Sequence, residues 1–148
     1  MAYDIGPLED GGRLGVKRLL ALAAYLETID DRTYDHRAWR GLGADRVMCA
    51  LGHGATALPD LIGLRWRKPG CDDIVRLDGS GMTENPLILA AEAFELSPDE
   101  ASQIFGVGLH TVNFYGPGGA FRLTPRAVAE AIRKFAYGKL AMETMAAA

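Results

Sequence analysis

The chain contains 148 residues, the usual size of one domain, of which 49% are apolar and 24% are charged. This balance predicts a packed core and excludes a chain that is disordered throughout. The formal net charge of −3 argues against nucleic acid as a partner. Because 12 of the 16 basic residues are arginine, a local site for a small anion stays open.

Three features of the sequence indicate in which cellular compartment the protein is expected: the N-terminal segment, the apolar stretches and the cysteines. The first residues are acidic and glycine-rich and lack the basic start and apolar run of a secretory signal. The longest apolar stretch, from Leu19 to Leu26, is far shorter than the roughly 20 residues that cross a bilayer. Cys49 and Cys71 are too few for a disulfide scaffold. We therefore expect a cytoplasmic protein with reduced thiols and no membrane partner.

The chain shows no internal repeat and no low-complexity linker, so the sequence predicts a single globular domain over residues 14–140. We expect a flexible N-terminus over residues 1–13. The alanine-rich end over residues 141–148 is expected to fray.

The first half of this domain should hold two helices. Apolar residues repeat at spacings of three and four between residues 14 and 29 and form one stripe: Leu19, Leu22, Leu26 and Ile29. A polar segment that contains Trp39 follows. Asp45 then caps a short predicted helix through Leu51, which Gly52 and Gly54 should end.

A β-hairpin is predicted in the middle of the chain. Residues 64–67 alternate apolar and charged side chains, residues 74–77 form the returning strand, and a proline and a glycine lie between them. The two apolar residues of the first strand should face the core. Arg65 and Arg67 should lie together on the opposite face.

The C-terminal half predicts three more helices, each with a polar cap followed by proline. The caps are Asn85, Ser97 and Thr124, and Glu100 gives the second one the spacing of a capping box. Residues 106–121 form a predicted glycine-rich, aromatic loop between the second and third of these helices. The fold class expected from all elements is α+β and mainly helical, with about five short helices and one small antiparallel β-hairpin.

Cys49 is the first candidate for catalysis. Near the start of a helix its thiolate would be stabilised by the helix dipole, and His53 or His110 could act as the base. A free cysteine within an apolar run is also commonly a small buried side chain, and residues 47–51 form such a run. A cysteine-dependent hydrolase is therefore an alternative and not the leading hypothesis.

Metal and phosphate chemistry have less support. Cys49, His53 and His110 would need a fourth ligand, and the chain has no C-x-x-C or H-E-x-x-H pair. The glycine clusters lack the spacing of phosphate-binding and dinucleotide-binding loops, so these glycines are assigned to turns and helix ends. We expect no cofactor and no bound metal.

A binding function has more support from the residue pattern. The arginine face of the hairpin and the long aromatic loop could together contact an anionic partner. The candidate binding residues are Arg65, Arg67, His53, His110, Asn113 and Tyr115. The alternative is that the two arginines pair with nearby acids such as Asp72 or Asp73, and that the aromatic residues close the edge of the core.

Five motifs occur in a fixed order along the chain. They are the leucine-alanine helix near the start, D-x-x-x-W at Asp35, C-A-x-G-[HW] at Cys49, F-x-L-S-x-x-E-A at Phe94 and a T-P helix start at Thr124. In this order the chain resembles a group of short hypothetical proteins from bacteria and their phages. Many members carry a further cysteine upstream of the C-A-x-G turn, and this chain has none there. The resemblance implies the fold and a phage or mobile-element setting, and it implies no activity.

The leading hypothesis from the sequence is a non-enzymatic binding protein, such as a phage-encoded accessory factor or inhibitor. Its expected partner is a small anionic ligand or a host protein. The first alternative is the cysteine hydrolase described above. The second is a structural subunit of an oligomeric assembly, in which apolar loop residues such as Phe114 and Phe121 would be buried between chains.

Overall fold

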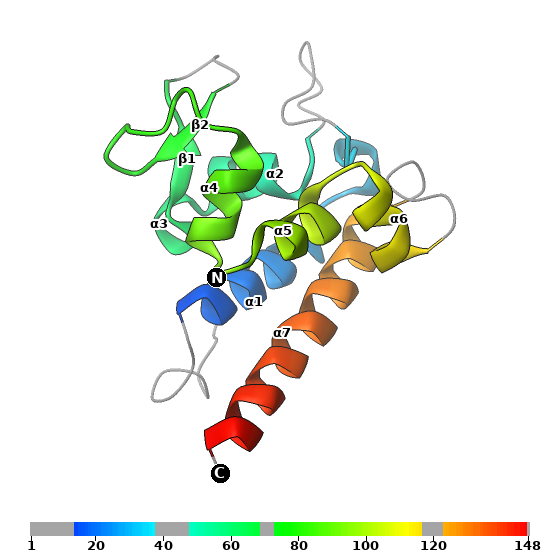
Figure 1. The fold of residues 1–148 in the computed structure, drawn as a ribbon. Coiled ribbons are helices and arrows are strands. Elements are labelled where there is room, and N and C mark those ends of the chain that lie inside the picture. The colour runs from blue at the N-terminus through cyan, green and yellow to red at the C-terminus, as the bar shows by residue number, and fades with distance from the viewer. Residues whose placement is uncertain (1–13, 38–47, 69–72, 117–122, 148) are drawn as a thin grey trace.

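The computed structural model describes residues 14–37, 48–68, 73–116 and 123–147. In these residues it contains seven α-helices, one short 3₁₀-helix and one two-stranded antiparallel sheet, which confirms a mainly helical α+β fold (Figure 1). The elements follow in this order: α1 (Leu14–Leu26), η2 (Asp31–Thr33), α2 (Ala50–Ala57), α3 (Pro59–Ile62), β1 (Leu64–Trp66), β2 (Ile74–Arg76), α4 (Pro86–Ala93), α5 (Pro98–Phe105), α6 (Leu109–Tyr115) and α7 (Pro125–Ala147).

The first and last helices pack against each other, below the other elements in the view of Figure 1. Arg133 of α7 pairs with Glu27, just after the end of α1. Lys139, farther along α7, reaches the carbonyl of Glu95, whose carboxylate in turn accepts a hydrogen bond from the Gly15 amide at the start of α1. The two helices therefore run antiparallel.

The predicted stripe of α1 is confirmed as the main core face of that helix. Leu19, Leu22 and Leu26 are fully buried, and Ile29 is partly buried against the same core. Burial of a leucine side chain contributes about 2 kcal/mol, so this face supplies a large part of the driving force for folding. The helix itself ends at Leu26, three residues earlier than expected.

The second helix differs from the prediction. It begins at Ala50 and runs through Gly52 and Gly54 to Ala57, whereas the two glycines were expected to end it. The missing side chain of Gly54 explains the difference, because a Cβ there would lie 2.8 Å from Cδ1 of Ile62. This glycine allows α3 to pack closely on α2, and tertiary packing outweighs its poor helix propensity. The predicted cap Asp45 lies outside the described residues.

Residues 106–116 are the second correction, because much of the predicted loop is helical. Helix α6 begins after Gly108, whose carbonyl accepts hydrogen bonds from the amides of Thr111 and Val112. Thr111 is completely buried, and its hydroxyl donates to the carbonyl of Ser102 at 2.8 Å. Packing on α5 therefore holds a short helix that its β-branched and aromatic residues would not favour alone.

The three predicted helix caps are confirmed. The Asn85 side chain accepts a hydrogen bond from the amide of Leu87, and Thr124 accepts one from Ala127. Ser97 and Glu100 form the reciprocal capping box, with hydrogen bonds of 3.1 and 2.8 Å.

The predicted hairpin is present as strands β1 and β2, which pair with Leu64 opposite Arg76. Leu64 and Trp66 are buried as expected. The Trp66 indole N–H donates to the hydroxyl of Thr56 at 2.9 Å, which ties the sheet to α2. The predicted turn lies mostly outside the described residues.

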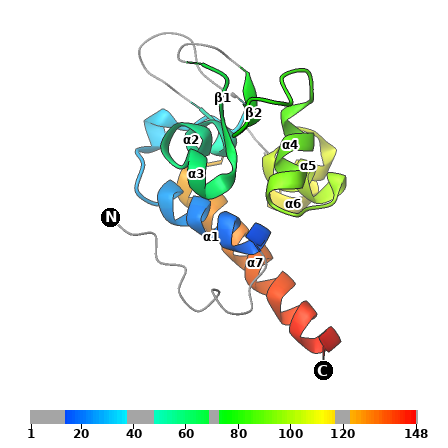
Figure 2. The same cartoon turned by 90° about the vertical axis from the view of Figure 1, so that its left-hand side faces the viewer.

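Helix α7 continues to Ala147, and its last turns extend past the rest of the described chain (Figures 1 and 2). The division into residues 1–13, 14–140 and 141–148 stays a prediction, and the first of these segments is outside the described residues. No helix in the described part of the chain is long and apolar enough to span a membrane.

Candidate functional site

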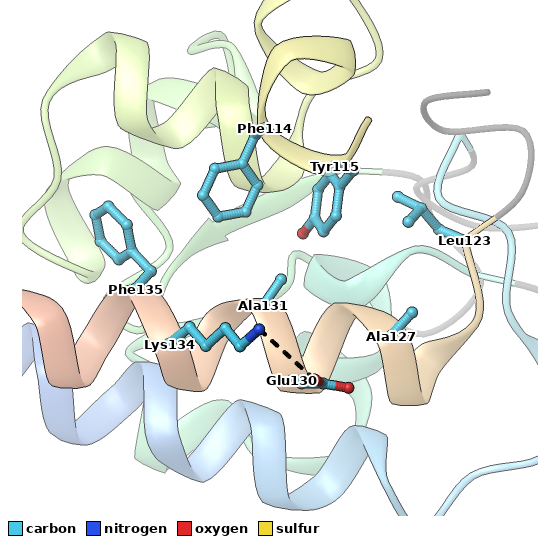
Figure 3. A pocket seen from close by; sticks show the side chains of 8 residues that line it. All are labelled: Phe114, Tyr115, Leu123, Ala127, Glu130, Ala131, Lys134 and Phe135. Atoms are coloured by element: carbon cyan, nitrogen blue, oxygen red, sulfur yellow. Dashed lines mark ion pairs between the residues drawn. The ribbon is translucent and has the colours of Figure 1, made fainter. Parts of the chain in front are cut away.

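A groove with a volume of about 490 Å³ lies between α6 and α7 (Figure 3). Helix α6 forms one wall and the exposed side of α7 forms the floor. The lining residues are Phe114, Tyr115, Leu123, Ala127, Glu130, Ala131, Lys134 and Phe135. Six of these eight are apolar or aromatic, so the groove suits an apolar occupant.

Aromatic contacts hold the wall of the groove in place. The Phe114 ring meets Tyr115 edge to face with centroids 4.8 Å apart, and it meets Phe135 of α7 at 6.3 Å. The Tyr115 hydroxyl donates to the carbonyl of Ile104 at 3.0 Å. Burial of this hydroxyl raises the pKa of Tyr115, so the phenol stays neutral and keeps its proton for that bond. The groove is therefore pre-formed by packing rather than by exposed polar contacts.

The two charged residues of the groove belong to its floor. Glu130 and Lys134 are one helical turn apart, and their oxygen and nitrogen lie 3.8 Å from each other (Figure 3). Both side chains are largely exposed, at 70% and 80%. They have opposite signs, so the groove has no net charge.

The structure separates the candidate binding residues of helix α6. Tyr115 lines the groove, while His110 and Asn113 are exposed and do not line it. The Nε2 atom of His110 lies 3.8 Å from the carboxylate of Asp99 on α5. Among these three residues, only Tyr115 is placed to contact a molecule bound in the groove.

Behind the Tyr115 wall lies a buried cluster of phenol and imidazole rings. Tyr115 meets His36 edge to face with centroids 5.5 Å apart. His36 is only 2% exposed, and its Nδ1 atom lies 2.6 Å from the hydroxyl of Tyr34. When this hydroxyl donates, Nδ1 accepts and the imidazole proton lies on Nε2. That Nε2 atom is buried and has no hydrogen bond of normal geometry among the described residues, although backbone groups of Gly106 and Ile104 favour the protonated imidazole.

His53, a candidate binding residue, belongs to this buried cluster. Its ring stacks on Tyr34 with centroids 6.1 Å apart, and its Nε2 atom lies 2.7 Å from the carbonyl of Thr33. Burial lowers the pKa of His53, so the neutral ring donates to this carbonyl near neutral pH. Its role in the structure is to fasten the segment around Tyr34 to α2.

Cys49 lies at the N-cap of α2, as a helix-dipole argument would require, but its side chain is buried. Amide groups of Leu51 and Gly52 favour the thiolate, yet burial dominates and raises the pKa of Cys49 to about 12. The thiol is therefore protonated near neutral pH. This arrangement favours the interpretation of Cys49 as a small buried side chain of the core. It gives no support to Cys49 as a catalytic nucleophile.

We expect Cys49 to resist alkylation in the native protein. A pKa of about 12 instead of 9.0 reduces the thiolate fraction on the order of a thousandfold at neutral pH, and burial also blocks access. The measurement is mass spectrometry after treatment with iodoacetamide, with the urea-unfolded chain as the control. Stoichiometric modification of Cys49 in the native protein would contradict the buried assignment and revive the hydrolase alternative.

The arginines of the hairpin make contacts within the chain. The guanidinium of Arg65 donates to the carbonyls of Trp66, Arg67 and Leu77, each at 3.0 Å. The guanidinium of Arg67 pairs with the Asp73 carboxylate at 3.0 Å. The pairing of Arg67 agrees with the alternative in which local acids neutralise this face.

A second hollow of about 410 Å³ lies where the hairpin meets α1 and α4. Arg18 and Arg76 line it, but so do Asp78 and Glu92. Arg76 is also held by Glu84 at 2.7 Å and by Glu92 at 2.8 Å. This hollow has no excess of positive charge that would favour an anion.

Sequence reasoning missed His36 and the floor of the groove. His36 stands in a polar segment and lacks a recognisable motif, so no local signal marked it as buried. The exposed face of α7 did leave a signal, because Ala131, Phe135, Gly138 and Met142 are spaced four, three and four residues apart. Val128 and Ile132 of the same helix are fully buried in the core, and Phe135 is half-buried at the groove.

Comparison of the chain with protein-family models, with curated proteins and with solved structures finds no match in any of the three. The motif resemblance to short bacterial and phage proteins therefore stays a prediction. No group of three or more His, Cys, Asp or Glu side chains in the described residues could hold a metal ion.

Proposed function

We propose that this chain is a non-enzymatic binding protein of the cytoplasm, and that its binding site is the groove between α6 and α7. The observation that carries the proposal is the groove itself, which has a volume of about 490 Å³ and six apolar or aromatic residues among its eight lining residues. Most of the candidate catalytic groups in the described residues are enclosed, whereas this groove is open to a partner. The proposal retains Tyr115 from the sequence-based candidates as a contact residue.

The groove favours an apolar segment of a protein over a small anion. The charges of Glu130 and Lys134 cancel within the groove, and the hairpin arginines already have partners in the chain. The floor is one face of a helix, so two turns of an apolar helix could pack along it, with side chains against Phe114 and Tyr115. The proposed occupant is therefore a helical segment with apolar side chains three and four residues apart.

Photo-crosslinking from the floor of the groove tests this proposal. Ala131 is replaced by the photoreactive amino acid p-benzoylphenylalanine in cells that produce the protein, and adducts are identified by mass spectrometry. Asp60 is the control position, because it is exposed on α3 and far along the chain from the groove. We expect one discrete polypeptide to be attached at Ala131 and not at Asp60.

A charge placed in the groove provides the second arm of the test. With the photoreactive residue at Ala127, the further change Ala131→Glu should reduce the yield of adduct roughly tenfold, because a carboxylate would lose its hydration under an apolar occupant. Equal adduct patterns at the groove and at Asp60, or an undiminished yield in Ala131→Glu, would show that the groove is not the binding site.

A further inference from the structure

The exposed side of α7 has an apolar seam with the spacing of a coiled coil. Ala131, Phe135, Gly138, Met142 and Met145 follow one another at intervals of four, three, four and three residues. This is the alternation of a and d positions that brings one helix against another. The seam lies beside the packed stripe of the helix, on which Val128, Ile132 and Ala136 are fully buried.

The seam has two halves of different shape. In its first half, Ala131 and Phe135 form part of the floor of the groove. In its second half, α7 extends past the rest of the described chain (Figures 1 and 2) and leaves Met142 and Met145 exposed, at 72% and 76%. One half is therefore a groove and the other half is a ridge of large apolar side chains.

We propose that the ridge of one copy of this chain fills the groove of a second copy, so that two α7 helices pack antiparallel about Gly138. This inference rests on the proposed function, because it names the partner that occupies the groove. The pairing follows a twofold axis, so both grooves and both ridges are covered at once and the assembly closes as a dimer.

Shape complementarity supports this partner. Pairing about Gly138 puts Met145 of one copy opposite Ala131 of the other, so a long flexible side chain meets a short one. Methionine adapts readily to such a groove and packs well against aromatic rings. At the axis, a Cβ atom on Gly138 would have no neighbour within 4 Å, so the space there is open for the second helix to approach. The absence of side chains at this crossing allows close packing of the two backbones.

Charge also fits a second copy. The opposite signs of Glu130 and Lys134 leave the groove without a net charge that would repel an identical face. The same pairing places Lys134 opposite Met142 of the second copy, where its methylene stem can cover the thioether.

Sedimentation equilibrium of the full chain tests the inference. The wild type should have twice the 15.9 kDa mass of the chain, and the double variant Met142→Glu, Met145→Glu should have the mass of one chain. Both methionines are exposed, so circular dichroism should be unchanged. The matched control is Ile88→Glu, which also replaces an exposed apolar residue, at 55%, but lies on α4 away from the seam. This control should remain dimeric.

Disulfide formation tests the register of the two helices. Gly138→Cys in a Cys71→Ser background should form a covalent dimer on mild oxidation, because position 138 meets its own copy at the axis. Cys49 is buried and should not take part. Gly108→Cys in the same background is the control, because Gly108 also has open space around it but lies outside the seam. Equal cross-linking of the two variants would overturn the antiparallel pairing.

The outcomes separate this inference from the proposed function. A monomeric wild type that is still photo-crosslinked from Ala131 to a different polypeptide would overturn self-association and leave the binding function in place. A monomeric wild type with no adduct from the groove would overturn both. A dimer that survives the double methionine variant would overturn the seam as the interface.

Discussion

Replacement of Gly15 by alanine is expected to lower the free energy of unfolding by about 3 kcal/mol or more. Gly15 does not line the groove and does not belong to the candidate site. Gly15 lies in the first turn of α1, where a Cβ atom would be 2.1 Å from the carbonyl oxygen of Phe94 and 2.5 Å from its carbon. The obstacle is backbone, so it cannot move aside as a flexible side chain can. Overpacking of this kind costs about 1–3 kcal/mol in ordinary cores, and a backbone clash lies at or beyond the upper end of that range.

Relief of the clash would have a further consequence. Movement of α1 away from Phe94 would also lengthen the hydrogen bond of 2.8 Å from the Gly15 amide to the Glu95 carboxylate. The measurement is urea unfolding followed by circular dichroism. The control is Gly108→Ala, where a Cβ has no neighbour within 4 Å. Because Gly108 is the N-cap of α6, where alanine is less favourable than glycine, the loss of stability should stay within about 1 kcal/mol. If the two variants are equally stable, α1 does not pack on the α4–α5 connection as described.

Gly15 also shows why part of the fold could not be predicted from the sequence. The caps at Ser97 and Thr124 and the stripe of α1 were predictable, because they depend on residues only a few positions apart. Gly15 and Gly54 depend on segments that lie far away along the chain or in another helix. Gly15 is required because the backbone of Phe94 lies close to it, and Gly54 because the side chain of Ile62 does. A single sequence does not reveal these contacts, so helix α2 was predicted to end too early.

The candidate site was predictable to a smaller extent. Tyr115 was a candidate binding residue from the sequence and it lines the groove, but the segment that carries it was expected to be a loop and is a helix. Arg65 was selected for an exposed charge, yet its guanidinium turns back onto backbone carbonyls, a choice that depends on how the hairpin closes. The groove needs α6 and α7 side by side, and this arrangement arises only through the packing of both helices on the core.

The buried cluster explains the position of the segment around Tyr34. The Tyr34 hydroxyl lies 2.6 Å from His36, and the Nε2 atom of His53 lies 2.7 Å from the carbonyl of Thr33. The Tyr115 ring, which forms the wall of the groove, packs edge to face against His36. These rings link the segment before α2 to α6. A change in the charge of His36 should therefore affect the stability of the domain and the wall of the groove together.

Acidification is expected to destabilise the protein through His36. Burial lowers the pKa of this imidazole from 6.5 to about 4. The unfolded chain therefore binds the proton more tightly than the folded chain, and stability falls as the pH falls. The contribution of His36 is complete above about pH 6.5 and is lost as the pH falls through about 4, which amounts to about 3 kcal/mol.

Other groups titrate in the same range and must be separated from His36. Burial also lowers the pKa of His53, and Arg37 lowers the pKa of Asp35, so both residues also lose stability as the pH falls. Burial raises the pKa values of three further groups at the cluster, so these groups stay neutral as the pH falls. They are Tyr34, Cys49 and Tyr115. A comparison of wild type with a variant at position 36 removes these shared contributions.

The variant His36→Gln serves this purpose, because a glutamine carbonyl can accept the hydrogen bond from the Tyr34 hydroxyl and does not titrate. Urea unfolding is measured for both proteins at about pH 7 and about pH 4. The wild type should lose about 3 kcal/mol more than the variant between these two conditions. If the variant does not fold, NMR titration of the His36 imidazole in the wild type gives the same information, since its midpoint should lie near pH 4. A midpoint near the ordinary value of 6.5 would mean that solvent reaches His36 and that Tyr115 does not seal the cluster.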